Sequence, residues 1–272
     1  PIKHLSDMLS IYILLYQGES IASSKKLYKA TQKIWEYLEK QDTWYESDLR
    51  LLRTILHHFP IEVLPDITDK ILESLKKYKN YRNIKPFQIA LLTNLSNIYF
   101  HAGKTSDCEK IINLAIELAK QAGLQICIDL ASYNIVENDL EFFTMLVRDY
   151  VDIVFANEEE ARAFTGKDAA EALKQIGQMC SIAIVKVGAR GSHILKGQDD
   201  IMVSALPVSK VVDTTGAGDY FAAGFLYGLT CGYSLEKCGK IGSMLSANVI
   251  QVVGTTLPQH KWNEIKLNIN TL

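Results

Sequence analysis

The sequence predicts a two-part chain of the α + α/β class. Residues 1–113 are expected to form an α-helical repeat, and residues 114–272 an α/β domain with a mainly parallel sheet. Apolar residues recur with helical spacing up to about residue 122. After Gly123, short continuous apolar runs alternate with amphipathic segments, which is typical of buried parallel strands joined by helices. These two observations place a change of architecture within one chain.

The first part is predicted to be helical throughout. Two apolar stripes with helical spacing are Leu49, Leu52, Leu56 and Phe59, and Leu91, Leu95 and Ile98. The expected helix breaks are Gly18, Pro60, Pro65, Pro86 and Gly103. Helices of this length with short turns predict stacked antiparallel pairs. The helix 107–122 could either end this part or be the first crossover helix of the second.

The second part begins with strands at LQICIDLA (124–131), VDIVFA (151–156) and IAIVKV (182–187). Amphipathic segments at 138–148, 158–166 and 168–179 lie between or beside them. This β-α-β-α-β order predicts parallel strands with right-handed crossovers. SHILKG, IMVSA and VSKVV are expected to add short strands, and helices near 216–230, 234–251 and 260–268 to complete the part.

Composition excludes several classes of protein. The net charge of −2 gives no reason to expect nucleic acid or a membrane surface as a partner. No apolar run approaches the ~20 residues needed to span a bilayer, and the first residues lack a secretion-signal pattern. The cysteines number five with no CxxC pair, so free thiols and a cytoplasmic location are expected. No metal site made only of protein ligands is apparent.

The stretch VVDTTGAGDYFAAGFLYGL (211–229) predicts an anion site. A β-branched run ends at Asp213, and an apolar helix is expected to start near Gly216. Gly216 and Gly218 allow unusual dihedrals and close approach of a ligand, and free N–H groups at a helix start attract anions. Asp219 follows directly, as a base beside a bound phosphoryl group would. The alternative is an ordinary glycine turn with Asp as a helix cap.

These residues resemble a known family. DTTGAGD resembles the signature of the PfkB (ribokinase-like) sugar and nucleoside kinases, and FANEEEA, IVKVGARGS and SANVIQVVGTT resemble its other motifs in the family order. The resemblance covers about 115–270 and implies a partial ribokinase-like fold. It also implies ATP-dependent transfer of a phosphoryl group to an alcohol of a sugar or nucleoside, with nucleotide and that alcohol as partners.

The resemblance also implies roles for matched positions. Asp219 would be the general base, and Gly216, Ala217 and Gly218 would form the backbone anion hole. The residues beside the nucleotide would be Lys186 and Gly188 at the phosphates, and Asn248 and Gly254 near the adenine. The residues beside cations would be Asn157 and Glu160 for Mg²⁺ through water, and Asp213 and Thr215 for a monovalent cation, K⁺. For Glu158 and Glu159, acidic residues at a helix start suffice as an explanation.

Only about half of a family member is matched. The part that binds the acceptor in the family has no counterpart in residues 1–113. Phosphoryl transfer requires the acceptor hydroxyl to be held in line, so an inactive kinase is the alternative to an active one.

The first part resembles a second family. NLSNIYFHAGKTSDCEKIINLAIELA (94–119) resembles a tetratricopeptide-like unit, and the wider part resembles the C-terminal helical domain of Rgg-type peptide-sensing transcription regulators. That resemblance implies a short peptide as partner, with Asn94 and Asn97 clamping its backbone, although both could be plain surface amides. The DNA-binding segment of such regulators is not found here, so direct binding of nucleic acid is not expected.

Two such parts in one chain suggest a composite or fused protein, and a homodimer is a further expectation. The leading hypothesis is therefore a PfkB-type kinase. The alternatives are a peptide-binding regulatory helical domain and a chain in which neither part is functional.

Overall fold

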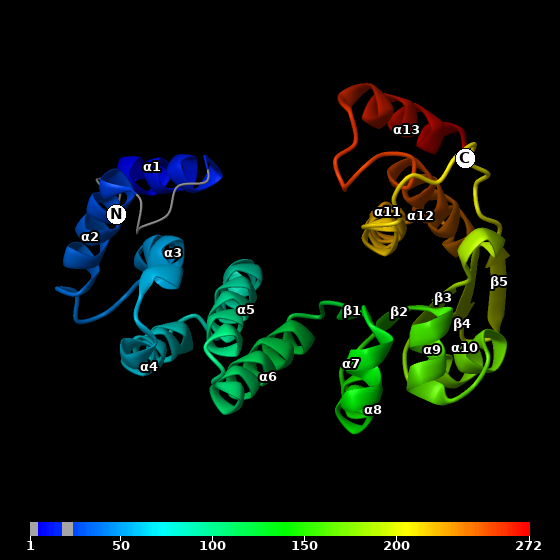
Figure 1. Ribbon diagram of the computed structural model, residues 1–272. Coiled ribbons are helices and arrows are strands. Elements are labelled where there is room, and N and C mark those ends of the chain that lie inside the picture. The colour runs from blue at the N-terminus through cyan, green and yellow to red at the C-terminus, as the bar shows by residue number, and fades with distance from the viewer. Residues whose placement is uncertain (1–4, 18–23) are drawn as a thin grey trace. The chain divides into compact units, whose positions relative to one another are not determined.

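The computed structural model describes residues 5–17 and 24–272, apart from the side chain of Arg82 (Figure 1). It divides into two compact units, Pro1–Leu124 and Gln125–Leu272. The helix that the sequence left between the two parts, Thr105–Gln121, falls in the first unit. The predicted break at Gly18 lies outside the described residues.

The first unit is helical, and its described residues contain no strand. Its helices are α1 (Leu5–Tyr16), α2 (Lys25–Leu38), α3 (Glu46–Ile55), α4 (Leu64–Lys76), α5 (Lys85–His101) and α6 (Thr105–Gln121), with short 3₁₀ turns η2 (Leu56–His58), η3 (Ile61–Val63) and η4 (Arg82–Ile84). Pro65 and Pro86 lie in the first turns of α4 and α5, where a missing N–H costs no hydrogen bond. The prolines therefore begin helices in this unit.

The core of this helical unit follows the predicted apolar stripes. Leu49, Leu52 and Leu56 are fully buried, as are Leu91 and Leu95. Trp44 is also buried, and its indole N–H donates to the carbonyl oxygen of Leu38 at 2.9 Å. The stripes thus identify the helix faces that pack together, as helical periodicity should.

The second unit contains one mixed sheet in the order β1-β2-β3-β4-β5. Its strands are β1 (Cys127–Asp129), β2 (Ile153–Asn157), β3 (Ile182–Lys186), β4 (Ser192–Lys196) and β5 (Asp199–Val203). The first three strands run parallel, and β4 and β5 are added antiparallel. This confirms the predicted fold class, a helical region followed by an α/β unit with mainly parallel strands.

The strand predicted at VSKVV (208–212) is wrong. The segment is irregular, and Val211 and Val212 are exposed. The backbone N–H groups of Val212 and Asp213 both donate to the carbonyl oxygen of Ile250, beside the end of a helix. With its amides bonded there, the segment follows that helix end instead of joining the sheet.

Helices cover both faces of the sheet (Figure 1). α7 (Tyr133–Asn138), α8 (Leu140–Asp149), α9 (Glu158–Thr165) and α10 (Ala169–Gly177) pack with Val154, Ala156, Ala183 and Val185. α11 (Ala217–Thr230) and α12 (Leu235–Val249) pack with Ile153, Phe155, Ile182 and Ile184 on the opposite face. Burial on both faces explains why β2 and β3 read as continuous apolar runs.

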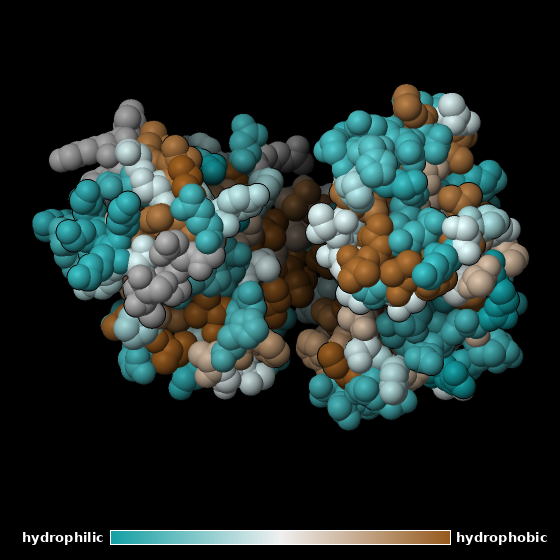
Figure 2. Space-filling view, turned by 45° about the horizontal axis from the view of Figure 1, so that its top comes forward, coloured by the Kyte–Doolittle hydropathy of each residue, from teal (hydrophilic) through white to brown (hydrophobic). Residues whose placement is uncertain are grey.

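The last helix, α13 (Gln259–Thr271), packs through Ile265 and Ile269 beside α12. α11 and α12 approach each other closely, because a Cβ atom added at Gly224 would lie 2.9 Å from the Cα atom of Gly242. None of the described helices is long and apolar enough to cross a membrane. The surface of each unit mixes hydrophilic and hydrophobic residues (Figure 2).

Candidate active site

The carboxyl ends of the parallel strands bring three polar side chains together. Asp129, Asn157 and Lys186 are the last residues of β1, β2 and β3. Asn157 pairs directly with Lys186 in the register of β2 and β3. Because parallel strands end at the same edge of a sheet, residues far apart in the sequence meet there.

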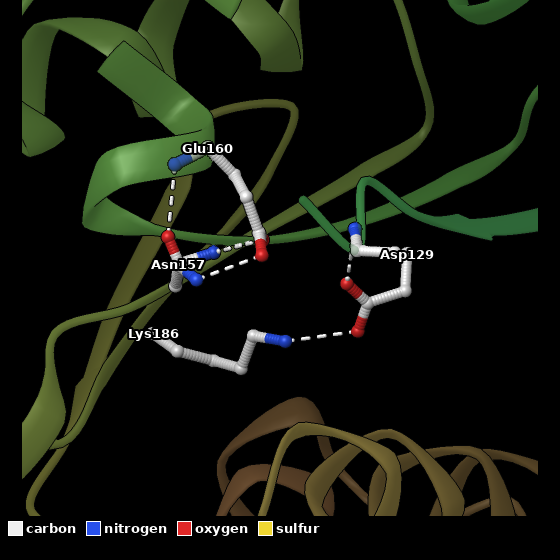
Figure 3. A network of polar contacts seen from close by, with 5 residues as sticks. Asp129, Asn157, Glu160 and Lys186 are labelled. Carbon is white, nitrogen blue, oxygen red and sulfur yellow. Dashed lines mark hydrogen bonds and ion pairs between the residues drawn. The ribbon is translucent and has the colours of Figure 1, made fainter. Parts of the chain in front are cut away.

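Lys186 and Asp129 form an ion pair at this edge (Figure 3). The Lys186 Nζ atom lies 2.9 Å from Asp129 Oδ2, and the two side chains are 16% and 27% exposed. The other carboxylate oxygen, Oδ1, accepts a hydrogen bond from the backbone N–H of Ala131 at 3.1 Å. Partial burial makes this pair stronger than an exposed one and fixes the position of the ammonium group.

Asn157 and Glu160 bind each other at the start of α9 (Figure 3). The backbone N–H and the side-chain amide of Asn157 each donate to one Glu160 carboxylate oxygen at 2.7 Å. The backbone N–H of Glu160 donates to Asn157 Oδ1 at 2.8 Å, which completes a capping box. Glu160 is 4% exposed, and this burial raises the pKa of its carboxyl group.

The glycine-rich turn precedes α11 and faces the same ion pair. Gly216 caps the helix with a φ of 77°, a left-handed conformation that favours glycine. A Cβ atom added at Gly218 would lie 3.1 Å from Lys186 Nζ and 4.0 Å from Asp129 Oδ2. The first turn of α11, with its free N–H groups, therefore meets the ammonium group of Lys186.

Asp213 and a later segment hold this turn in place. The Oδ1 atom of Asp213 accepts from Thr215 N at 2.9 Å and Thr215 Oγ1 at 2.7 Å, while Oδ2 accepts from Gly254 N at 2.9 Å. These bonds lower the pKa of the Asp213 carboxyl group. The hydroxyl of Tyr220 donates to the carbonyl oxygen of Thr255 at 2.7 Å. The segment around residue 254 is thus tied to both sides of the turn.

These groups line one cavity of about 910 Å³ within the second unit. Of the predicted site residues, those that line it are Asn157, Glu160, Lys186, Gly188, Gly216, Ala217, Gly218 and Asp219. The predicted residues that do not line it are Asp213, Thr215, Asn248 and Gly254. Asp219 is exposed, and its carboxylate has no hydrogen bond or ion pair with the residues that the structure describes.

The model of the pfkB family of carbohydrate kinases matches residues 70–262. This chain belongs to that family. The kinase family that the sequence resembled is therefore confirmed.

Several sugar and nucleoside kinases resemble this pfkB chain in sequence. An uncharacterized sugar kinase of Archaeoglobus fulgidus is 41% identical over 104 residues, covering 38% of this chain and 41% of that protein. The ribokinase of Arabidopsis thaliana is 31% identical over 163 residues, covering 55% of this chain and 41% of that protein. The chain thus spans less than half the length of these two relatives.

Solved structures give the same result. A probable sugar kinase from Rhizobium etli matches with a TM-score of 0.56 and 39% identity, covering 61% of this chain and 52% of that one. The adenosine kinase from Sinorhizobium meliloti matches with a TM-score of 0.57 and 34% identity, covering 59% and 50%. The pfkB fold is therefore present here over about half of each solved chain.

A second family model, the C-terminal domain of the HTH-type transcriptional regulator Rgg, matches residues 4–125. The two matches overlap over residues 70–125 and are consistent with a composite chain. Asn94 and Asn97, the predicted peptide contacts, lie on α5, where Asn94 is half-buried and Asn97 exposed. They do not line the cavity of about 580 Å³ that the helical unit contains between α2, η3 and α4.

Sequence reasoning missed Asp129. The signal for it was present, because Asp129, Asn157 and Lys186 all stand at or near the ends of three consecutive apolar runs. A carboxylate at the end of a predicted parallel strand should be placed with its neighbours' end residues. Strand β1 therefore contributes Asp129 to the cavity, in addition to the residues of the matched family motifs.

Proposed function

We propose that the second unit binds ATP and transfers its terminal phosphoryl group to an alcohol of a sugar or nucleoside. One observation carries the proposal: the Lys186 ammonium group and the first turn of α11 converge on one point of the cavity. A positive side chain and free N–H groups at a helix start attract the same anion. This convergence supports a site for the phosphates of a nucleotide.

Asp219 is the proposed general base. It stands in the first turn of α11, beside the proposed phosphate site, and it lines the cavity. Its carboxylate is not engaged by the described residues, so it is free to accept the proton of an attacking hydroxyl. A base must reach the proton it removes, and a place beside the transferring group provides that reach.

Mg²⁺ is the proposed companion of the nucleotide, held through water by Asn157 and Glu160. The donor set fits an indirect role, since both Glu160 oxygens already accept a bond from Asn157 and retain further acceptor capacity. Within the part of the chain that the structure describes, no three His, Cys, Asp or Glu residues are grouped to bind a metal directly. Bound Mg²⁺ would neutralise phosphate charge.

A K⁺ site at Asp213 and Thr215 stays a prediction from the family resemblance. Both carboxylate oxygens of Asp213 already accept hydrogen bonds from Thr215 and Gly254. This bonding supports a structural role for Asp213 in the turn, and Oδ2 retains further acceptor capacity.

Thermal unfolding with and without millimolar MgATP tests the proposal. A ligand at 100 times its Kd stabilises a protein by about 2.7 kcal/mol, so the second unit should unfold several degrees higher. Gly218→Val should abolish the shift because its side chain would meet Lys186, whereas Asp219→Asn should keep binding and lose phosphoryl transfer. The proposal is wrong if the parent chain shows no shift with ATP.

We also propose that the helical unit binds a short peptide. Its cavity is lined by the aromatic side chains of Tyr28, Trp35, Trp44 and Phe59, with Glu39, Asp66 and Lys70 among its polar residues. The Trp35 and Phe59 rings meet edge-on at 4.7 Å between centroids. Aromatic side chains with nearby charges are a common setting for peptide side chains. The Rgg match over this unit favours the same function.

Titration of the full chain with a library of short synthetic peptides, read by tryptophan fluorescence, tests this second proposal. Trp35→Ala should remove the response if the cavity is the site, and Asn97→Ala should leave it unchanged. A response lost in Asn97→Ala but kept in Trp35→Ala would instead place the peptide on α5.

A further inference from the structure

The cavity of the second unit has two chemically different parts. The polar part carries Lys186 and the acidic side chains already described. The apolar part comes from the segment between β5 and α11 and from the end of α12, and its residues are Ala205, Leu206, Pro207, Val208, Val211, Ala247 and Ile250. If the phosphates occupy the polar part, as proposed above, the base of the nucleotide meets this apolar wall.

Amide side chains near this wall are directed to their own helix. The Nδ2 atom of Asn248 donates to the carbonyl oxygen of Met244 at 2.9 Å, and Nε2 of Gln251 donates to that of Ala247 at 2.8 Å. Neither residue lines the cavity. Asn248, which the sequence placed beside the adenine, therefore has its amide N–H group engaged within α12.

The hydroxyl groups near the wall provide few hydrogen-bonding partners for a base. The Ser243 Oγ atom accepts from Leu206 N at 3.0 Å and donates its proton to the Ser204 carbonyl oxygen at 3.3 Å. Ser246 also lines the cavity. Among the described residues that line the cavity from this segment and from α12, Thr214 and Ser246 are then the side chains with a hydroxyl left to contact a base.

We propose that this wall accepts purine nucleoside triphosphates and does not discriminate adenine from guanine. Strong discrimination requires polar groups of the protein that are left unpaired by the wrong ligand, whereas apolar walls reject polar variants weakly. Adenine and guanine present the same bicyclic face to apolar side chains but differ in the polar groups at their edges. The inference names the nucleotide class and rests on the phosphate site proposed above.

Titration calorimetry of the full chain with Mg²⁺ and, in turn, ATP, GTP, UTP and inorganic tripolyphosphate tests the inference. ATP and GTP should bind with Kd values within about a hundredfold of each other, because an apolar pocket rejects a ligand that differs by a polar group by no more than that. UTP should bind more weakly than either, since its single ring covers less apolar area. Tripolyphosphate should bind with a Kd independent of the wall.

Two substitutions identify the wall as the cause. Leu206→Ala should weaken ATP and GTP by the same factor and leave tripolyphosphate unchanged. The matched control is Leu267→Ala, at an exposed leucine of α13 outside the cavity, which should change none of the three. Ser246→Ala should keep the ratio of the ATP and GTP Kd values.

The outcomes separate the two proposals. If tripolyphosphate and ATP bind but GTP binds more than a hundredfold more weakly than ATP, the inference is overturned and the phosphate site stands. A large change of the ATP-to-GTP ratio in Ser246→Ala would also overturn it, by showing that a side chain reads the base. If neither tripolyphosphate nor any nucleotide binds, the phosphate site itself is wrong, and the inference fails with it.

Discussion

The two units differ in where their side-chain hydrogen bonds lead. In the helical unit, the hydroxyls of Thr68 and Tyr99 bond to each other across 31 positions of sequence, and neither residue lines a described cavity. In the α/β unit, Lys186 binds Asp129 across 57 positions of sequence. A buried polar side chain is therefore not by itself a sign of function. Polar groups gathered from distant segments onto one cavity are a better sign.

The described part of the helical unit also buries polar atoms that form no hydrogen bond. Its described residues bury several polar side chains, and Lys85 Nζ and Gln88 Oε1 are without a hydrogen-bond partner among them. No described cavity includes either residue. Both groups are therefore buried polar atoms that lie apart from the described cavities.

Trp44→Ala should have the largest effect of the substitutions considered. This effect should be a loss of stability confined to the first unit. Trp44 is 1% exposed, and the Lys70 ammonium group lies 4.4 Å from its ring centre. Truncation of a buried Trp costs about 3–5 kcal/mol, so urea unfolding should show a strongly destabilised helical unit. Nucleotide affinity, measured by calorimetry in the absence of urea, should be unchanged. Loss of nucleotide binding in a folded variant would break the division between the units.

Lys186→Gln should have the next largest effect. This effect should be a loss of MgATP affinity in the second unit. A hydrogen bond to a charged group contributes about 1.5–3 kcal/mol, so MgATP affinity should fall roughly 10- to 100-fold. Lys196→Gln, at an exposed lysine on β4, makes the same charge change away from the cavity and should leave the affinity as it is.

Asp129→Asn then refines the role of the ion pair. If Asp129 only positions Lys186, the double variant with Lys186→Gln should bind MgATP no more weakly than Lys186→Gln alone. Additive losses in this double-mutant cycle would mean that Asp129 contacts the ligand or its metal independently.

Two helix caps offer a smaller, matched comparison. The Ser24 side chain accepts from Leu27 N at the start of α2, and Asn157 Oδ1 accepts from Glu160 N at the start of α9. Ser24→Ala and Asn157→Ala should each cost about 1 kcal/mol of stability. Only Asn157→Ala should also weaken MgATP binding, as calorimetry would show. Equal effects on binding would contradict the assignment of Asn157 to the site.

The smallest effect is a pH dependence of opposite sign in the two units. Partial burial, with the nearby charge of His57, lowers the pKa of His58 below its ordinary value of 6.5. The neutral His58 side chain contributes fully to the stability of the helical unit above pH 6.5. This contribution is lost as the pH falls through the lowered pKa of the folded state. Burial raises the pKa of the Glu160 carboxyl group above its ordinary value of 4.5. As the pH falls through this raised pKa, the folded state takes up a proton before the unfolded state does, so the stability of the second unit rises.

Hydrogen exchange followed by mass spectrometry between pH 7.5 and 5 resolves the two units. After correction for the intrinsic rate, protection should decline in the helical unit and hold or rise around α9. His58→Gln should flatten the decline in the helical unit. A decline around α9 of the same size would contradict the assigned direction for Glu160.

Much of the second unit could be predicted because each local pattern agreed with the fold. The runs at 151–156 and 182–187 are apolar at every buried position, so they fit strands with helices on both faces. The ends of those strands, with the turn at Gly216–Gly218, define the polar part of the cavity. Asp129 joins this set only when the end residues of neighbouring parallel strands are considered together.

Other features depend on tertiary contacts that periodicity does not carry. VSKVV has the β-branched residues of a strand, yet its final amides bond to the end of α12. Asn248 lies in a matching motif, but its amide bonds to the preceding turn of its own helix. In the first unit, helical spacing identifies buried faces such as that of Leu49 and Leu52, whereas the cavity beside Trp35 depends on how the helices are stacked.

The close glycine contact between α11 and α12 has a mechanical consequence. The start of α11 carries the turn at Gly216–Gly218, and the end of α12 carries Ala247 and Ile250 of the apolar wall. Because neither Gly224 nor Gly242 has a side chain, the two helices pack closely against each other at this point. This packing fixes the spacing between the turn and the wall, which are carried by opposite members of the helix pair. A nucleotide that spans turn and wall would therefore meet two surfaces whose separation is set by glycine packing away from the cavity.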